Sequence, residues 1–572
     1  MSGASDRPRV PRVLGVCGAG TMGAGIAQLG CLAGMRTRLH DPDHAALNRA
    51  IDAVGARIER EAQRGRLDAR EARAALERLV AAPTLAELAD CELVIEAAPE
   101  RAELKRDLFR ALSEIVASDC VLATNTSSLS VTALASAAAR PERVVGMHFF
   151  NPPPLMAAVE IVAGLHSGES ALDAARAAGE AMGRRVIDAA DGPGFLINRC
   201  NRPFSLEALR LLSERVATAE QIDRICRLGG RFRMGPFELM DLVGLDVGLD
   251  VARSFHEQSF GEPRWRPSPL VASMVAAGRL GRKAGRGWYE YPPSGSHRPP
   301  DPEPPPAGGA EGLVVIEGTS TLARQIADAA RGAGWEVAGV EPEAGGGRPF
   351  LVLEVDREHN RAGRPAVGRG TSPGEDETAR HGGMCAQPAA TPAATAEDQR
   401  RGAPRAVCCW SGSLAALEGA GPAVGFHALA PFAECGLVEM TRGPGTDPSA
   451  QRAAERFFTS LGRHVEWVAD APGLVLGRIV CALVNEAAFA LGEGVGEALD
   501  IDAGMRLGLN YPRGVLAWGD EIGLDRVLGA LEGLCRERGE DRYRPAPALR
   551  SLCLTGRLGR ATGEGFLAHG AQ

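Results

Sequence analysis

The sequence contains almost no lysine. Only two of its 64 lysine and arginine residues are lysines, Lys105 and Lys283, and all the others are arginines. Lysine carries a compact ammonium group, whereas arginine carries a planar guanidinium. A position that keeps lysine in this chain is therefore a candidate for a functional cation, although chance survival of two lysines explains the same count.

Long hydrophobic runs and an excess of positive charge are also missing. No uninterrupted apolar run reaches the roughly 18 residues that a membrane-spanning helix needs, and residues 1–12 lack the hydrophobic core of a signal peptide. We therefore expect a cytoplasmic protein with no membrane partner. The formal net charge of −8 argues against a general nucleic-acid binder.

Cysteine is sparse and shows no pattern. The chain has 13 cysteines in 572 residues, an odd number, without the paired spacing of a metal site. This favours reduced thiols over a disulfide framework, and it predicts no metal site.

The second half of the chain repeats the first. The segment Gly-Met-His-Phe at 146–149 recurs as Gly-Phe-His-Ala at 425–428, and Asp223 recurs as Asp502 at the same offset of 279 residues. Further matches continue at this offset, or at one residue less, to the end of the first copy. Such a span indicates an internal duplication.

Each copy divides into an α/β half and a helical half. Short β-rich runs alternate with helical stretches, and helix-length apolar periodicity follows them. The expected fold is an α/β Rossmann-type domain plus an all-α domain, duplicated, with the second Rossmann-like domain degenerate. The expected boundaries are 1–185 and 186–291 for the first copy, 292–311 for a proline-rich linker, 312–465 with a mobile insertion at 356–406, and 466–572 for the second helical domain.

A glycine-rich turn follows the first apolar run, residues 13–17. In such a strand-turn-helix context the glycines provide a tight turn, close approach to a pyrophosphate and close packing of helix on strand, and the helix N-terminus favours phosphates. Asp41 ends the second predicted strand, where its carboxylate suits both ribose hydroxyls and would repel a 2′-phosphate. An ordinary glycine turn beside a surface aspartate is the alternative. The predicted NAD site comprises Gly18, Gly20, Thr21, Met22, Gly23 and Asp41.

The corresponding turn of the second copy is degenerate. Residues 318–323 read Gly-Thr-Ser-Thr-Leu-Ala and keep only the first glycine. Side chains then stand where the pyrophosphate would approach. We therefore expect no dinucleotide in the second α/β domain.

A predicted antiparallel hairpin brings a histidine and a glutamate together. Residues 143–150 form one apolar run, the prolines at 152–154 interrupt it, and 157–162 form the next. A hairpin centred near Pro154 places His148 opposite Glu160, with Cβ atoms roughly 5 Å apart. Such a carboxylate would fix the imidazole tautomer of a general base. A purely structural buried pair remains the alternative.

Three polar residues lie where ligands of such a sheet bind. Asn125 and Ser127 follow the predicted strand 121–124, and Ser127 is a candidate donor to a cofactor or a carbonyl group, or simply a helix cap. Asn198 lies at the start of the first helix of the helical half. Its amide suits a substrate oxygen, although the residue taken alone favours a plain polar residue at a helix start.

Together these motifs resemble the L-3-hydroxyacyl-CoA dehydrogenase family. The segments that carry the resemblance are 18–28, 93–100, 125–129, 148–152 and 194–199. The two-copy arrangement resembles a bacterial subgroup of 3-hydroxybutyryl-CoA or 3-hydroxyadipyl-CoA dehydrogenases associated with phenylacetate breakdown, in which the second nucleotide fold is likewise degenerate.

The resemblance implies roles for the candidate residues. His148 would be the catalytic base, Glu160 its orienting partner, and Ser127 and Asn198 the groups that bind the oxygen end of the substrate. It also implies cofactor contacts, and the residues assigned to NAD beyond the glycine turn are Asp41, Glu100, Lys105, Asn125, Ser127, Asn151 and Lys283. Both lysines fall on cofactor positions.

The implied reaction is oxidation of an L-3-hydroxyacyl-CoA to a 3-ketoacyl-CoA with NAD. Arg57 and Arg64, in the arginine-rich stretch 49–78, are candidates for the phosphates of CoA, with a solvated helical face as the alternative. A dehydrogenase of a free hydroxy acid or sugar acid remains a rival interpretation, and so does a binding paralogue without turnover.

The second copy lacks most of the implied machinery. It keeps His427 and Glu439, but the position of Asn198 becomes Gly477. We expect it to be inert and to serve as an internal partner, with its helical domain packed on the first in a pseudo-dimer. A homodimer of the whole chain is also open.

Overall fold

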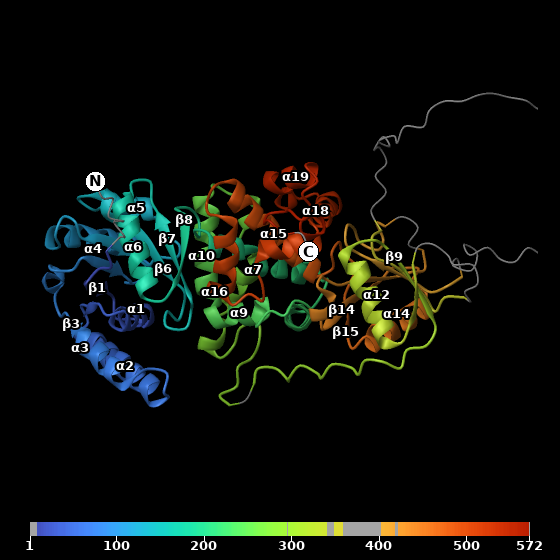
Figure 1. The fold of residues 1–572 in the computed structure, drawn as a ribbon, viewed down its shortest axis with the longest axis horizontal. Helices are drawn as coiled ribbons and strands as arrows, with labels where there is room; N and C mark the ends of the chain where they lie inside the picture. The colour runs from blue at the N-terminus through green and yellow to red at the C-terminus, as the bar shows by residue number, and fades with distance from the viewer. Residues whose placement is uncertain (1–8, 295, 340–347, 358–401, 418–420, 571–572) are drawn as a thin grey trace, which may run out of the picture. The chain divides into compact units, whose positions relative to one another are not determined.

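The computed structural model describes residues 9–294, 296–339, 348–357, 402–417 and 421–570. They belong to two compact units (Figure 1). The larger unit joins Met1–Asp301 to Arg478–Gln572, and the smaller unit is Pro302–Gly477. No helix among the described residues is long and apolar enough to cross a membrane.

An eight-stranded sheet begins the larger unit. Its strand order is β3-β2-β1-β4-β5-β6-β7-β8, and β6 pairs with β7 in antiparallel fashion while the other described pairs are parallel. The strands are β1 Val13–Cys17, β2 Arg36–His40, β3 Leu79–Ala81, β4 Leu93–Glu96, β5 Val121–Thr124, β6 Val144–Phe149, β7 Ala158–Ala163 and β8 Arg185–Ala190. The helices are α1 Thr21–Leu32, α2 His44–Gln63, α3 Ala69–Arg78, α4 Ala102–Ile115, α5 Val131–Ala135 and α6 Glu169–Ala181.

Apolar side chains on both faces of this sheet build its core. Successive residues of a strand point to opposite faces, so Leu93 and Ile95 of β4 join the core under α1 and α6, whereas Val94 joins the core under α4 and α5. The parallel strands β1, β5 and β6 end at one edge of the sheet, and this edge carries the glycine turn and His148.

Two helical copies pack together in the larger unit (Figure 1). The first copy contains α7 Ile197–Ser213, α8 Ala219–Arg224, α9 Pro236–Val243, α10 Leu245–Gln258 and α11 Pro269–Ala276. The second contains α15 Leu476–Gly492, α16 Ala498–Leu509, α17 Val515–Ile522, α18 Leu524–Arg538 and α19 Pro547–Leu554. Asp223 accepts hydrogen bonds from the first turn of α9, and Asp502 does the same for α17. The predicted duplication is therefore visible in matching helix caps.

Close backbone approach and buried ion pairs join the two helical copies. A Cβ atom on Gly504 of α16 would lie 2.1 Å from Cδ1 of Ile197, so only glycine lets α16 pack this tightly on α7. Arg478 of α15 is fully buried, and its Nε lies 2.9 Å from Glu207 of α7. Tyr511 donates a hydrogen bond of 2.7 Å to Asn201.

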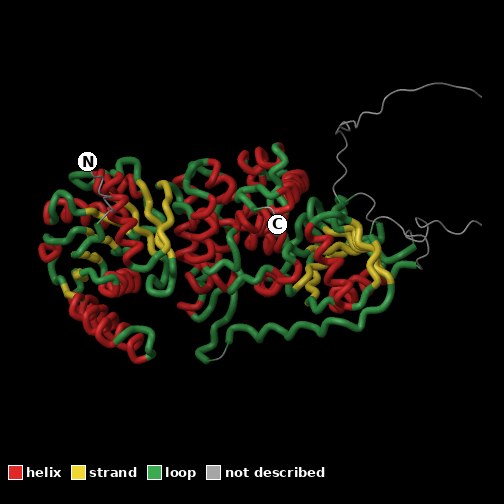
Figure 2. Tube along the Cα trace, in the orientation of Figure 1, coloured by secondary structure: helices red, strands yellow, loops and turns green. Residues whose placement is uncertain are grey.

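The smaller unit repeats the α/β half in reduced form. Its sheet has the order β10-β9-β11-β12-β13-β14-β15, with β13 and β14 antiparallel. Figure 2 shows its strands in yellow with helices against them. The elements are β9 Leu313–Glu317, α12 Thr321–Ala333, β10 Glu336–Ala338, β11 Leu351–Glu354, β12 Arg405–Cys408, β13 Val424–His427, β14 Leu437–Arg442, α14 Pro448–Ser460 and β15 His464–Trp467.

The fold class is confirmed, but several boundaries differ from the expected ones. β8 extends the first sheet to Ala190, past the expected boundary at 185, because it pairs with all six residues of β7. β15 likewise runs past the boundary at 465. Of the expected insertion at 356–406, residues 358–401 lie outside the described part, and Arg405 already belongs to β12.

Candidate active site

The glycine turn between β1 and α1 has the geometry of a phosphate-binding loop. Gly18 has φ +111°, and a Cβ there would lie 2.5 Å from the carbonyl oxygen of Ala97. A Cβ on Gly23 would lie 1.8 Å from the carbonyl oxygen of Gly18. Around Gly20, at the N-terminus of α1, a Cβ would meet no atom within 4 Å. Two glycines are thus needed for packing, and the third leaves open space in front of the helix N-terminus.

Asp41 lies beside this turn. It follows β2, and its Oδ2 accepts a hydrogen bond of 2.8 Å from the backbone N–H of Ala19. Thr21 and Met22 form the first turn of α1, with Thr21 exposed and Met22 partly buried. The carboxylate therefore stands at the glycine turn, as a ribose-binding acid must.

Glu100 supports the loop that carries Ser127. Its carboxylate accepts hydrogen bonds from the backbone N–H of Ser127 at 3.2 Å and from the hydroxyl of Ser128 at 2.8 Å. Burial would raise the pKa of Glu100, but Lys105 and the hydroxyls of Thr126 and Ser128 hold that pKa below its usual value. In the described part of the chain the hydroxyl of Ser127 itself has no hydrogen-bond partner, so it is open to a ligand.

Asn125 ties the same loop to β6. Its Oδ1 accepts a hydrogen bond of 2.8 Å from the backbone N–H of Phe149, the residue after His148. Asn151 follows β6 and is exposed. The loop after β5 and the end of β6 therefore lie together at one edge of the sheet.

The two lysines have different surroundings. The ammonium of Lys105 is buried, 2.7 Å from Glu96 and 3.1 Å from Glu100. Lys283 lies beyond α11, is half exposed, and contacts Asp246 at 2.6 Å. Lys105 already holds two carboxylates of its own chain, whereas Lys283 presents an accessible cation. Their cofactor contacts stay predictions.

His148 and Glu160 form a buried pair in the predicted register. Residue 148 of β6 faces residue 160 of β7, and Nδ1 of His148 lies 2.6 Å from Oε2 of Glu160. The rings of Phe150 and Phe195 lie against the imidazole, with centroids 4.8 and 5.9 Å away. Among the described residues Nε2 has no hydrogen-bond partner. The predicted hairpin is confirmed, and it leaves one ring nitrogen free to exchange a proton.

Glu160 also holds the start of the helical domain. Its Oε1 accepts hydrogen bonds from the backbone N–H groups of Leu196 and Ile197, at 3.1 and 2.9 Å. Asn198 follows as the second residue of α7, half buried, and no described residue bonds its amide. One carboxylate thus fixes both the imidazole and the helix that carries Asn198.

Comparison with known proteins agrees with this geometry. The model of the 3-hydroxyacyl-CoA dehydrogenase NAD binding domain matches residues 13–192, and that of the 3-hydroxyacyl-CoA dehydrogenase C-terminal domain matches 194–291 and 473–569. The chain belongs to the 3-hydroxyacyl-CoA dehydrogenase family. Its NAD-binding domain is the one with the intact glycine turn, so NAD is the cofactor that this turn and Asp41 fit.

Relatives in this family match the chain over one copy or over both. The 3-hydroxyadipyl-CoA dehydrogenase of Escherichia coli is 34% identical over 95% of this chain and 98% of its own length. The 3-hydroxybutyryl-CoA dehydrogenase of Bradyrhizobium diazoefficiens is 39% identical over 49% of this chain and 96% of its own. The crystal structure of a 3-hydroxybutyryl-CoA dehydrogenase from Escherichia coli has a TM-score of 0.74 and 32% identity, covering 96% of this chain and 99% of that one.

The histidine of the second copy is inaccessible to solvent. His427 faces Glu439 in the register of the first copy, but the ring is fully buried and stacked on Trp410 at 5.1 Å. A Cβ on Gly477, the counterpart of Asn198, would lie 2.3 Å from Nε2 of His427. The ring thus fills the space where the first copy carries its amide.

The glycine turn of the second copy holds a carboxylate of its own chain. Oδ2 of Asp356 accepts hydrogen bonds from the backbone N–H groups of Thr319 and Ser320, at 2.6 and 2.7 Å. These are the donors that would face a pyrophosphate at the start of α12. A negative charge there repels phosphate, which agrees with the expected lack of a dinucleotide in this copy.

Two residues near the site were not expected from the sequence. Glu96, at the end of β4, is fully buried and accepts hydrogen bonds from Lys105 and Thr124. The sequence does carry a signal for Glu96, because it is an acidic residue at the end of a buried apolar strand. Arg202 of α7 is the other, and nothing in the sequence distinguishes it from the many surface arginines.

Proposed function

We propose that the first copy oxidises the C3 hydroxyl of an L-3-hydroxyacyl-CoA to a ketone, and that it also catalyses the reverse reduction. The pair of His148 and Glu160 carries this proposal, because Nε2 is free while Nδ1 is held at 2.6 Å. NAD, when bound at the glycine turn, supplies the hydride acceptor. The names of the relatives specify different acyl groups, 3-hydroxyadipyl and 3-hydroxybutyryl.

His148 would act as the general base. Nε2 would take the proton of the C3 hydroxyl, and Glu160 would stabilise the imidazolium that forms. The hydroxyl of Ser127 and the amide of Asn198 would donate hydrogen bonds to the substrate oxygens. The buried rings of Phe150 and Phe195 exclude water beside the imidazole. In the reverse direction the imidazolium would return its proton to the alkoxide.

Arg57 is the stronger of the two candidates for the phosphates of CoA. It lies on α2, and its Nε and Nη2 atoms are buried without a partner in the described part of the chain. Burial lowers the pKa of its guanidinium. An anion would satisfy these orphan donors. Arg64, at the end of α2, is exposed and lies 3.7 Å from Glu61, so it would contribute less.

We also propose that the second helical copy takes the place of a partner subunit. The buried contacts of Arg478 with Glu207 and of Tyr511 with Asn201 support this role. A cytoplasmic location stays a prediction of the sequence.

The deciding experiment is a substrate panel. Steady-state rates with NAD are measured for short 3-hydroxyacyl-CoAs and for the corresponding free 3-hydroxy acids, and acetoacetyl-CoA with NADH tests the reverse reaction. The proposal requires turnover of the CoA thioesters only. Turnover of the free acids alone would support the rival hydroxy-acid dehydrogenase, and NAD binding without turnover of either would support the binding paralogue.

A further inference from the structure

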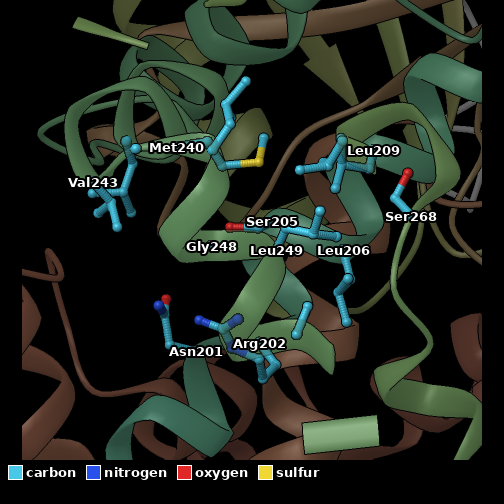
Figure 3. A pocket seen from close by; sticks show the side chains of 15 residues that line it. Asn201, Arg202, Ser205, Leu206, Leu209, Met240, Val243, Gly248, Leu249 and Ser268 are labelled. Atoms are coloured by element: carbon cyan, nitrogen blue, oxygen red, sulfur yellow. The ribbon is translucent and has the colours of Figure 1, made fainter. Parts of the chain in front are cut away.

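An apolar cavity of about 100 Å³ lies in the first helical copy (Figure 3). It is bounded by α7, α9, α10 and the start of α11, and most of its wall consists of leucine, valine, methionine, alanine and glycine. None of its fifteen lining residues is acidic, and Arg202 is the single charged residue among them. In Figure 3 the polar ends of Asn201 and Arg202 lie together on one side of the cavity. The cavity is therefore an apolar space with one cation at its wall.

Arg202 lacks the carboxylate partner that other arginines of this region have. Arg199, on the same helix, lies 2.9 Å from Glu486, whereas Arg202 has no acidic partner among the described residues. Its Nε donates only to the carbonyl oxygen of Asn198, at 3.4 Å, and its guanidinium lies 5.1 Å from the ring centre of Phe255. Burial lowers the pKa of Arg202 to about 10. A guanidinium held this way gains by meeting an anion.

The helix α7 links Arg202 to the candidate active site. Asn198 and Arg202 are four residues apart on α7, so they share one face of the helix with an axial rise of about 6 Å. A substrate held at C3 by Asn198 would therefore have its distal carbons within one helical turn of the guanidinium.

The ring of Phe255 makes a second link. It lies beneath Arg202 and against Gly194, where a Cβ would stand 1.8 Å from the ring. The next residue, Phe195, contacts His148. Contacts through Phe255 and the segment of Gly194 and Phe195 thus connect the cavity wall at Arg202 with the histidine.

Helix α10 connects the cavity to the Ser127 loop. Leu245 and Leu249, in its first half, line the cavity. Gln258, at its end, donates a hydrogen bond of 2.7 Å to the carbonyl oxygen of Ser128. The walls of the cavity are therefore continuous with the elements that position the substrate oxygen.

We propose that this cavity receives the distal part of a dicarboxylic 3-hydroxyacyl chain and that Arg202 binds its terminal carboxylate. The inference rests on the proposed acyl-CoA dehydrogenase function and specifies its substrate class. The apolar wall suits the methylene groups, and the planar guanidinium suits a carboxylate at two donor positions. In a six-carbon chain this carboxylate lies three bonds beyond the reacting C3, within the reach set by α7.

Two substrates of equal length test the inference. The values of kcat/KM with NAD are measured for 3-hydroxyadipyl-CoA and for 3-hydroxyhexanoyl-CoA, which ends in a methyl group. We expect the wild-type chain to favour the dicarboxylic substrate by about 10- to 100-fold, the range of a charge-assisted hydrogen bond. Arg202→Met should remove this preference, mainly through a higher KM for 3-hydroxyadipyl-CoA, and leave the value for 3-hydroxyhexanoyl-CoA unchanged or higher. Arg202→Lys should retain part of the preference.

The matched control is Arg253→Met on α10, because Arg253 is 62% exposed and lies outside the cavity. It should leave both values unchanged. Equal wild-type activity on the two substrates would overturn the inference without any variant, and so would an equal loss of both activities in Arg202→Met. Failure of the proposed function is a different result, since the wild-type chain would then turn over neither CoA thioester.

Discussion

The two carboxylate oxygens of Glu160 contact different partners, His148 and the first turn of α7. Oε2 lies 2.6 Å from Nδ1 of the imidazole, and Oε1 accepts the N–H of Ile197 at 2.9 Å. The orientation of the imidazole is therefore set by the same side chain that fixes the helix carrying Asn198. A change at residue 160 would disturb the base and the substrate-binding amide together.

Replacement of His148 should separate chemistry from cofactor binding. His148→Ala should lower kcat by at least about 10²-fold, because the hydroxyl proton loses its acceptor. NAD affinity, measured by fluorescence titration, should stay unchanged because the glycine turn is untouched. His427→Ala is the matched control in the second copy and should leave kcat per folded chain unaltered. Wild-type turnover by His148→Ala would remove this residue from the mechanism.

Gly20 should control NAD binding without controlling folding. A Cβ at this position meets no atom within 4 Å, so Gly20→Val should fold normally and fill the space in front of the N-terminus of α1. We expect at least a tenfold loss of NAD affinity in calorimetric titration. The counterpart Ser320→Val in the second copy should bind NAD like the wild-type chain. Unchanged affinity in Gly20→Val would place the cofactor elsewhere.

The parts of the fold that depend on local pattern could be predicted from the sequence. Two apolar runs, interrupted by the prolines around Pro154, were enough to place His148 opposite Glu160. The glycine turn likewise followed from a strand, three glycines and a helix. The boundary at 185 was set too early because residues 185–190 alternate in burial as a strand but also fit the start of a helical half.

Contacts between distant segments could not be predicted in this way. Arg199 and Glu486 are 287 residues apart, and no local pattern indicates that they meet. Arg202 is one arginine among many, and only the packing of the helices shows that no carboxylate of the described residues pairs with it. The carboxylate of Asp356 in the second glycine turn is hidden for the same reason.

The interface between the helical copies should be sensitive to loss of Arg478. This side chain is fully buried and bonds the buried Glu207 and the more exposed Glu214. Arg478→Leu would leave Glu207 with Arg210 and Tyr543 as its remaining partners. We expect a loss of about 1–3 kcal/mol in the free energy of unfolding, measured by urea denaturation. Arg331→Leu, at a position 58% exposed on α12, should cost less than about 0.5 kcal/mol. Equal losses of unfolding free energy in both variants would contradict the proposed role of the second helical copy as an internal partner.

Protonation of Glu262 should weaken the contact between the helical copies in acid. Burial would raise the pKa of its carboxyl, but hydrogen bonds from Arg544 of the second copy and from Arg264 hold it at about 2, below the ordinary 4.5. Between pH 2 and pH 4.5 the folded chain therefore binds fewer protons than the unfolded chain. The stabilisation is complete above pH 4.5 and is lost as the pH falls towards 2.

At pH 7 Glu262→Gln should lower the free energy of unfolding by about 1–2 kcal/mol after allowance for solvent screening. Urea midpoints of both proteins at pH 7, 4.5 and 3.5 should converge in acid. Glu290→Gln, at an exposed position, should show no such convergence, and a pH-independent gap in Glu262→Gln would mean that its ion pair does not stabilise the contact.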